Sequence, residues 1–187
     1  MMRFNMPMYC AAVFVSLALV PPAATLGQAV KITHKMATPE AGGGFLAVSA
    51  SPSAVSFNLV AKGSATGNNP VSVTTGWTGL MNDTIHLYAY FTSASAALTG
   101  NLSGDLIPTS CVLGKMTTGL PTSNTAFTQT GPFGGAGNSL ELFSQTVAGN
   151  GLSFRTDALS LTIDLTSLPT LPADTYTGTL IIEAQAL

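Results

Sequence analysis

Histidine, cysteine and carboxylate side chains, which carry out most enzyme chemistry, are few and widely spaced in this chain. Its 187 residues include two histidines, His34 and His86, two cysteines and eight acidic residues. No HExxH pair or Asp-x-Asp calcium loop is present, and in the segment 63–67 (GSATG) the serine stands one place too early for a Gly-x-Ser-x-Gly elbow. We therefore expect no catalytic centre, metal site or cofactor. A secreted hydrolase stays open as an alternative, since triad residues can be far apart in sequence.

Two closer groupings of polar residues have simpler interpretations. Arg155 and Asp157 are two residues apart near a strand start, so they share a face, and we expect a local ion pair. The glycine-rich run 134–137 is followed by neither Lys-Ser nor Lys-Thr, which predicts a mobile loop instead of a phosphate site.

An aromatic row is the best candidate for a binding surface. His86, Tyr88 and Tyr90 alternate with apolar residues at 85, 87, 89 and 91, a pattern that predicts a strand with its aromatic side facing outward. Such rings can stack on sugars or pack against another subunit. The other interpretation is that a neighbouring loop of the same domain covers them.

The N-terminus has the layout of a secretory signal peptide, which we place at residues 1–29. Arg3 precedes an uncharged run from Met8 to Val20, followed by prolines and small residues. The run is shorter than the ~18 to 20 residues that a helix needs to cross a bilayer. We expect cleavage after Ala29, with Ala24 as the competing site, and a secreted protein of the extracellular space, periplasm or cell surface with no stable membrane span.

Charge and cysteine content restrict the partners. Five basic and eight acidic residues follow position 29, and the basic ones are scattered, so we expect no nucleic-acid partner. A surface built mostly from uncharged polar residues offers little charge repulsion and suits a subunit that assembles. Only Cys111 remains after the signal peptide, and its apolar neighbours predict a buried thiol.

Residues 45–187 are expected to form one all-β domain, an antiparallel Greek-key sandwich of about eight strands with Trp77 in its core. Short alternating segments are separated by Gly, Pro and Asn turns, with no helical period between them. The last two segments, 159–165 and 176–184, flank a turn-rich stretch and predict a closing hairpin. The predicted strands are 45–50, 55–60, 71–77, 84–91, 125–129, 139–147, 158–165 and 176–185.

Two segments carry a resemblance to known families. Residues 46–57 (LAVSASPSAVSF) resemble the first strand of bacterial extracellular immunoglobulin-like domains. Residues 171–180 (LPADTYTGTL) are similar to the end of spore-coat-U-like and pilin-like secreted proteins, in which Pro-Ala-Gly-Thr-Tyr commonly precedes the last strand. Asp174 stands where those families have glycine, which a turn tolerates. The resemblance implies an immunoglobulin-like sandwich and a non-enzymatic structural or interaction role at the cell surface.

The segment 30–44 precedes this domain as an N-terminal extension and linker. Val30, Ile32 and Met36 alternate with polar residues, and a Gly-rich stretch, 37–44, follows. Two interpretations stay open: this is the domain's own first strand, or a detachable strand that completes a neighbouring subunit in a pilin-like assembly. The expected partners are thus other copies, other surface proteins or, for a carbohydrate-binding or adhesive module, glycans.

Overall fold

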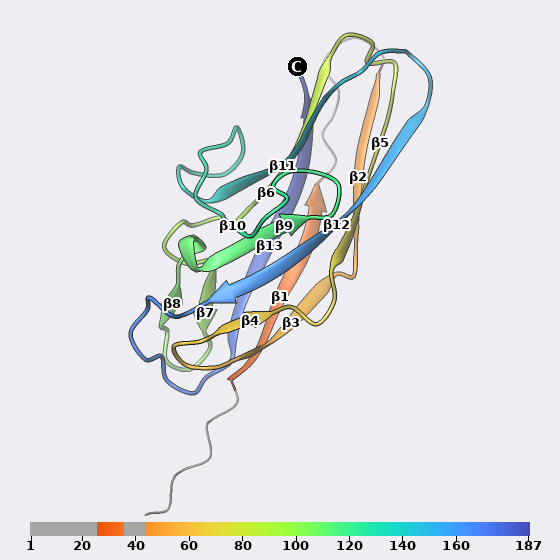
Figure 1. Ribbon diagram of the computed structural model, residues 1–187. Coiled ribbons are helices and arrows are strands. Elements are labelled where there is room, and N and C mark those ends of the chain that lie inside the picture. The colour runs from red at the N-terminus through yellow and green to blue at the C-terminus, as the bar shows by residue number, and fades with distance from the viewer. Residues whose placement is uncertain (1–25, 36–43) are drawn as a thin grey trace, which may run out of the picture.

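The computed structural model describes residues 26–35 and 44–187, and it is all-β there (Figure 1). These residues form thirteen strands and one turn of 3-10 helix, η1 (Thr109–Cys111). None of the described segments is a helix long and apolar enough to span a membrane. Most of the predicted signal peptide lies outside the described residues.

The first sheet has seven strands and contains both the first and the last strand of the fold. Its main path runs β11-β6-β13-β1-β3, and two short strands, β7 and β8, extend it beside β13. Every pair is antiparallel except β1 with β13, which is parallel. The strands are β1 (Leu26–Lys35), β3 (Ala54–Leu59), β6 (Thr84–Tyr90), β7 (Leu98–Gly100), β8 (Leu106–Ile107), β11 (Ser139–Thr146) and β13 (Tyr176–Ala186).

The second sheet has six strands and is wholly antiparallel. Its path is β10-β9-β12-β5-β2, with β4 paired to the far end of β12. The strands are β2 (Phe45–Ser51), β4 (Ser64–Thr66), β5 (Val71–Thr78), β9 (Val112–Met116), β10 (Thr125–Ala126) and β12 (Ser153–Asp164).

The core lies between the two sheets and is built from alternate residues of each strand. In β3 and β5, for example, every second side chain is buried, as a half-buried strand requires. Trp77 is buried there at 4% exposure, as the sequence predicts, and Cys111 is likewise buried with a free thiol. The all-β, two-sheet class is thus confirmed. The count of about eight strands is too low, because β4, β7, β8 and β9 are short and leave little periodic signal, and because β1 lies ahead of the residues counted as the domain.

The closing hairpin predicted from the sequence is wrong. β12 belongs to the second sheet and β13 to the first, so the two strands flank a connection that crosses from one sheet to the other. Alternation and turn residues identify where a strand stops, but they say nothing about its partner. In this case the connecting residues, 165–175, are too many for a tight two-residue turn.

Asp174 holds this crossing segment against the turn between β7 and β8. Its Oδ2 accepts hydrogen bonds from the backbone N–H groups of Leu102 and Ser103 at 2.9 and 2.8 Å and from the Ser103 hydroxyl at 2.9 Å. Its Oδ1 accepts from the N–H of Thr175 at 2.6 Å. These donors, with the Ser103 N–H first, lower the pKa of Asp174 to about 2. A glycine at this position could not make this connection.

We predict that Asp174 makes the fold sensitive to acid. A carboxyl group whose pKa drops from 3.8 to about 2 on folding stabilises the native state above pH 3.8, and that contribution is lost as the pH falls toward 2. Thermal unfolding of Asp174→Asn, followed by circular dichroism at a series of pH values, should therefore show a smaller loss of Tm across this window than the wild type. Asp164→Asn is the comparison: hydrogen bonds from Thr166 of its own turn also lower the pKa of Asp164, but no second segment is tied down there, so this variant should change the pH dependence of Tm less than Asp174→Asn does. Parallel Tm curves for wild type and Asp174→Asn would contradict the prediction.

Candidate functional site

The position of β1 between β13 and β3, which we call the seat of β1, is the first of two candidate sites. Residues 28–35 run parallel to 176–183 of β13, and residues 26–31 run antiparallel to 54–59 of β3. β1 is therefore an internal strand with a backbone ladder on both sides, and Figure 1 shows it lying along β13. It begins ahead of the predicted signal-peptide boundary, so cleavage after Ala24 would leave it whole, whereas cleavage after Ala29 would remove its first four residues.

The inward side chains of β1 complete the core. Val30 is fully buried and Ile32 is 4% exposed, while Lys31 between them is exposed. These are two of the three residues that the sequence assigns to an assembly strand. The third, Met36, lies outside the described residues. The sequence pattern of this segment thus corresponds to a strand that fills a vacancy between β13 and β3.

The row His86, Tyr88 and Tyr90 forms the second candidate site, on the outer face of β6. The neighbouring strands place one carboxylate on each side of it: Tyr88 lies directly opposite Glu141 of β11 and Glu183 of β13. His86 Nδ1 lies 2.8 Å from Glu141 Oε1, and the Tyr90 hydroxyl donates to Glu183 Oε2 at 2.9 Å. The sequence identifies the aromatic residues of this face but not the two acids that flank them, because those acids come from strands distant in sequence.

A loop covers part of this row. Phe133 stacks on Tyr90 with ring centroids 6.1 Å apart and meets Tyr88 edge-on at 6.0 Å. Tyr90 is consequently 8% exposed, whereas Tyr88 is half-buried. Gly134, with φ of +75°, turns the loop beside the Tyr90 ring, where a β-carbon would come within 2.8 Å of it. Phe133, directly before the glycine-rich segment, and Gly134 at its start therefore lie against the sheet, while residues 134–136 are exposed.

Burial and the adjacent carboxylates both disfavour ionisation of these tyrosines. Burial is the larger cause of the rise in the pKa of Tyr90 to about 12, and Glu183 adds to it. The pKa of Tyr88 is raised by burial and then by Glu141. Both phenols are therefore neutral hydrogen-bond donors near neutral pH, which suits packing and recognition more than proton transfer.

Arg155 and Asp157 form the predicted ion pair, but it is more buried than an ordinary surface pair. Arg155 Nε lies 2.5 Å from Asp157 Oδ2, and the Asp157 side chain is 3% exposed. Thr118 also donates its hydroxyl to Asp157, and the Arg155 guanidinium lies 4.8 Å from the centroid of the Phe143 ring. The pair thus joins β12 to β11 and to the loop after β9, which is a structural role.

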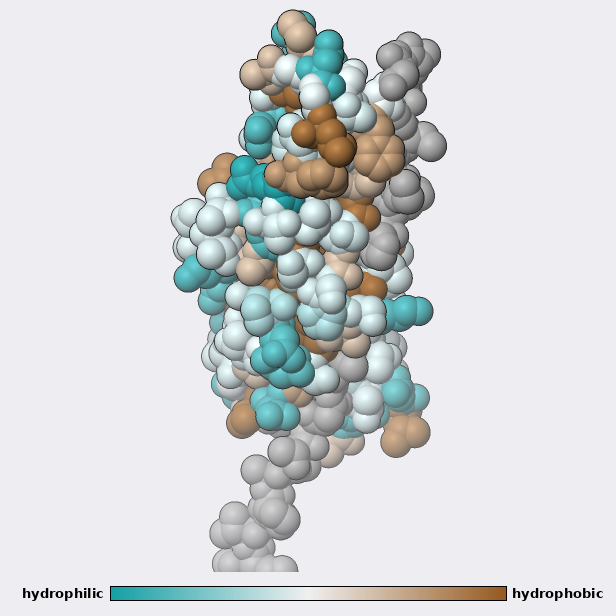
Figure 2. All heavy atoms as spheres, turned by 90° about the vertical axis from the view of Figure 1, so that its right-hand side faces the viewer, coloured by the Kyte–Doolittle hydropathy of each residue, from teal (hydrophilic) through white to brown (hydrophobic). Residues whose placement is uncertain are grey.

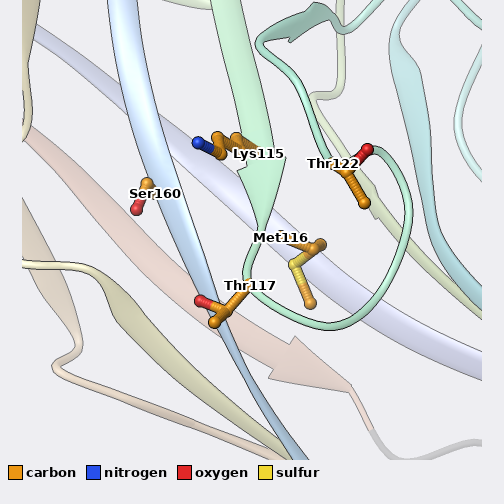
Figure 3. A pocket seen from close by; sticks show the side chains of 5 residues that line it. All are labelled: Lys115, Met116, Thr117, Thr122 and Ser160. Carbon is orange, nitrogen blue, oxygen red and sulfur yellow. The ribbon is translucent and has the colours of Figure 1, made fainter.

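A hollow of about 430 Å³ on the second sheet is lined by Lys115, Met116, Thr117, Thr122 and Ser160 (Figure 3). Lys115 and Ser160 lie directly opposite each other on β9 and β12. The lining supplies an amine, hydroxyls and a thioether, but neither a carboxylate nor an imidazole for general base catalysis. Within the described residues, no three His, Cys, Asp or Glu side chains are grouped closely enough to hold a metal ion.

No protein-family model matches the chain, and no curated protein is significantly similar to it.

We predict that removing one member of the buried ion pair is much more harmful than replacing both. Asp157→Ala should lower the free energy of unfolding by about 1 to 3 kcal/mol, because Arg155, which is 27% exposed, would lose its carboxylate and the Thr118 hydroxyl would lose its acceptor. Urea unfolding of Asp157→Ala and of the double variant Arg155→Leu/Asp157→Leu measures this difference. If the double variant loses as much stability as the single one, the pair is not the source of the effect.

For the aromatic row, we predict that Glu183→Gln lowers the pKa of Tyr90 from about 12 without returning it to the ordinary value of 10.0, since burial is the larger cause. The substitution removes the negative charge that disfavours tyrosinate and keeps an oxygen acceptor. Alkaline titration followed by tyrosinate ultraviolet absorbance gives the value, and Tyr90→Phe identifies which titration step belongs to Tyr90. An unchanged titration in Glu183→Gln would contradict the assignment.

Proposed function

We propose that this protein is a secreted, non-enzymatic structural subunit of the cell surface, an immunoglobulin-like sandwich that assembles with other copies by exchanging β1. The observation that carries the proposal is the position of β1. It is an internal strand held on both sides by backbone pairing, yet the chain that follows it in sequence, 36–44, is rich in glycine and small residues.

Exchange of β1 should cost little free energy, because the strand would make the same contacts in a neighbouring copy as it makes in its own. The two ladders to β13 and β3 and the burial of Val30 and Ile32 form equally well with a neighbour's strand. A subunit without a strand in this seat would expose two long unpaired edges and part of its core. The seat must therefore be filled, either by the subunit's own β1 or by that of another copy.

The character of the remaining surface supports a structural role. Only 7% of the residues are charged, so little repulsion opposes close approach of copies. Several side chains of types that often act in catalysis are instead paired with one another. Tyr90 is hydrogen-bonded to Glu183, His86 contacts Glu141, and Arg155 forms an ion pair with Asp157.

A cysteine pair across β1 and β3 tests the exchange directly. Lys31 and Ala54 are opposite residues with exposed side chains, and the hydrogen bond from Ile32 N–H to the Ser53 carbonyl, at 2.8 Å, makes them a non-hydrogen-bonded pair, whose side chains lie closest. In Lys31→Cys/Ala54→Cys, built on Cys111→Ala, exchanged β1 strands should link separate chains. Non-reducing electrophoresis after oxidation should then show a ladder of covalent oligomers.

The matched control is Thr74→Cys/Thr156→Cys in the same background. These two residues lie on β5 and β12, with their hydroxyl oxygens 2.8 Å apart, and neither strand is expected to exchange. The control should give a monomer with an internal disulfide. If the β1–β3 pair also gives only monomers, exchange does not take place and the proposal fails.

A further inference from the structure

The strand β2 forms one edge of the second sheet and pairs with β5 on one side only. Its seven residues, FLAVSAS, pair with β5 in continuous register from Phe45 to Ser51. On its other side, no backbone partner for β2 exists among residues 26–35 and 44–187. Alternate N–H and C=O groups of β2 therefore point away from β5, and the described part of the chain leaves them unpaired, as at an edge to which another strand can add.

The other long edges of the fold are covered. At the β3 edge, Ser56 bonds Asn68 through both of its backbone groups, at 2.9 and 3.0 Å. At the β11 edge, Gln129 exchanges two backbone hydrogen bonds with Ser139 and accepts a third from the Glu141 N–H, while Leu120 donates to the Leu142 carbonyl. β2 differs from both of these edges because the described chain leaves it open.

β2 also lacks the features that usually protect an edge strand. Between Phe45 and Ser51 it has no charged residue, no proline and no bulge. Exposed apolar side chains stand beside it: Phe45 is 42% exposed, and Phe154, 66% exposed, lies across Gly76 in the row next to it. Figure 2 shows apolar residues gathered near the top of the face formed by β2, β5 and β12, above a mostly pale surface with scattered hydrophilic residues.

We propose that this edge pairs with the β2 edge of a second copy, in an antiparallel arrangement with its twofold axis at Val48. That register places Val48 opposite its own copy, Leu46 opposite Ala50, Ala47 opposite Ser49 and Phe45 opposite Ser51. The buried side chains Leu46 and Val48 then continue the core-facing side of the second sheet in each copy. The two largest side chains of the strand, Phe45 and Leu46, meet the smaller Ser51 and Ala50.

A second copy fits this edge because the edge is complementary to itself. Neither β2 nor its neighbour β5 contains a charged residue, so the twofold arrangement brings no like charges together. The product is a closed pair with one continuous sheet across two sandwiches, an isologous contact. It is separate from exchange of β1, which uses the other sheet and joins copies head to tail.

Charged residues at two opposed positions test both the contact and its register. In Ala47→Lys/Ser49→Lys, each introduced lysine faces another across the axis, and dimerisation should weaken by about tenfold or more. In Ala47→Lys/Ser49→Glu, the same positions carry opposite charges, and the affinity should return toward that of the wild type. Sedimentation velocity over a concentration series of the full secreted chain gives the dissociation constants.

Ser144→Lys/Thr146→Lys is the matched control, because it adds the same charge at the same spacing on β11, and it should leave association unchanged. A wild type without a twofold pair, or a Lys/Glu variant as weak as the two-lysine variant, would overturn the proposal. The covalent ladder from the β1–β3 cysteine pair reports exchange independently, so failure of one contact is distinguishable from failure of the other.

Discussion

The pairing of β1 with both β13 and β3 is the constraint on which the first sheet depends. These two ladders are the connection between β3 and the strands grouped around β13. The backbone groups that β1 satisfies are strong, obligatory hydrogen-bonding groups, and its inward valine and isoleucine seal the core beneath them. β13 and β3 therefore belong to one sheet only when some copy of β1 lies between them.

Local properties of the chain could be predicted from its sequence. Alternation and turn residues located eight strands of the structure, along with the buried Trp77 and Cys111, because side-chain period and apolar context are encoded in adjacent residues. The Arg155–Asp157 pair was also predictable, since the two residues share a strand face. Its burial was not, because the covering groups, Thr118 and Phe143, come from other parts of the chain.

Non-local properties could not be read in the same way. The closing hairpin failed because β12 and β13 have similar alternating patterns but lie in different sheets. The aromatic row was identified, yet Phe133, Glu141 and Glu183 reach it only through the fold. The only local sign of this cover was the glycine-rich segment 134–137 just before β11. Because glycine has no side chain, a loop that contains it can lie close against the tyrosine rings.

The parallel orientation of β1 and β13 gives an exchanged assembly a direction. A donated β1 would leave its acceptor at the end where β13 finishes, beside the exposed Leu187, because the two strands run the same way. The donor's body would therefore sit beyond that end, and every junction along the row would repeat the same orientation. The two ends of such a row differ. The subunit at one end has an empty β1 position, and the subunit at the other end has a β1 that no neighbour has accepted. Growth or capping at the two ends would therefore require different partners.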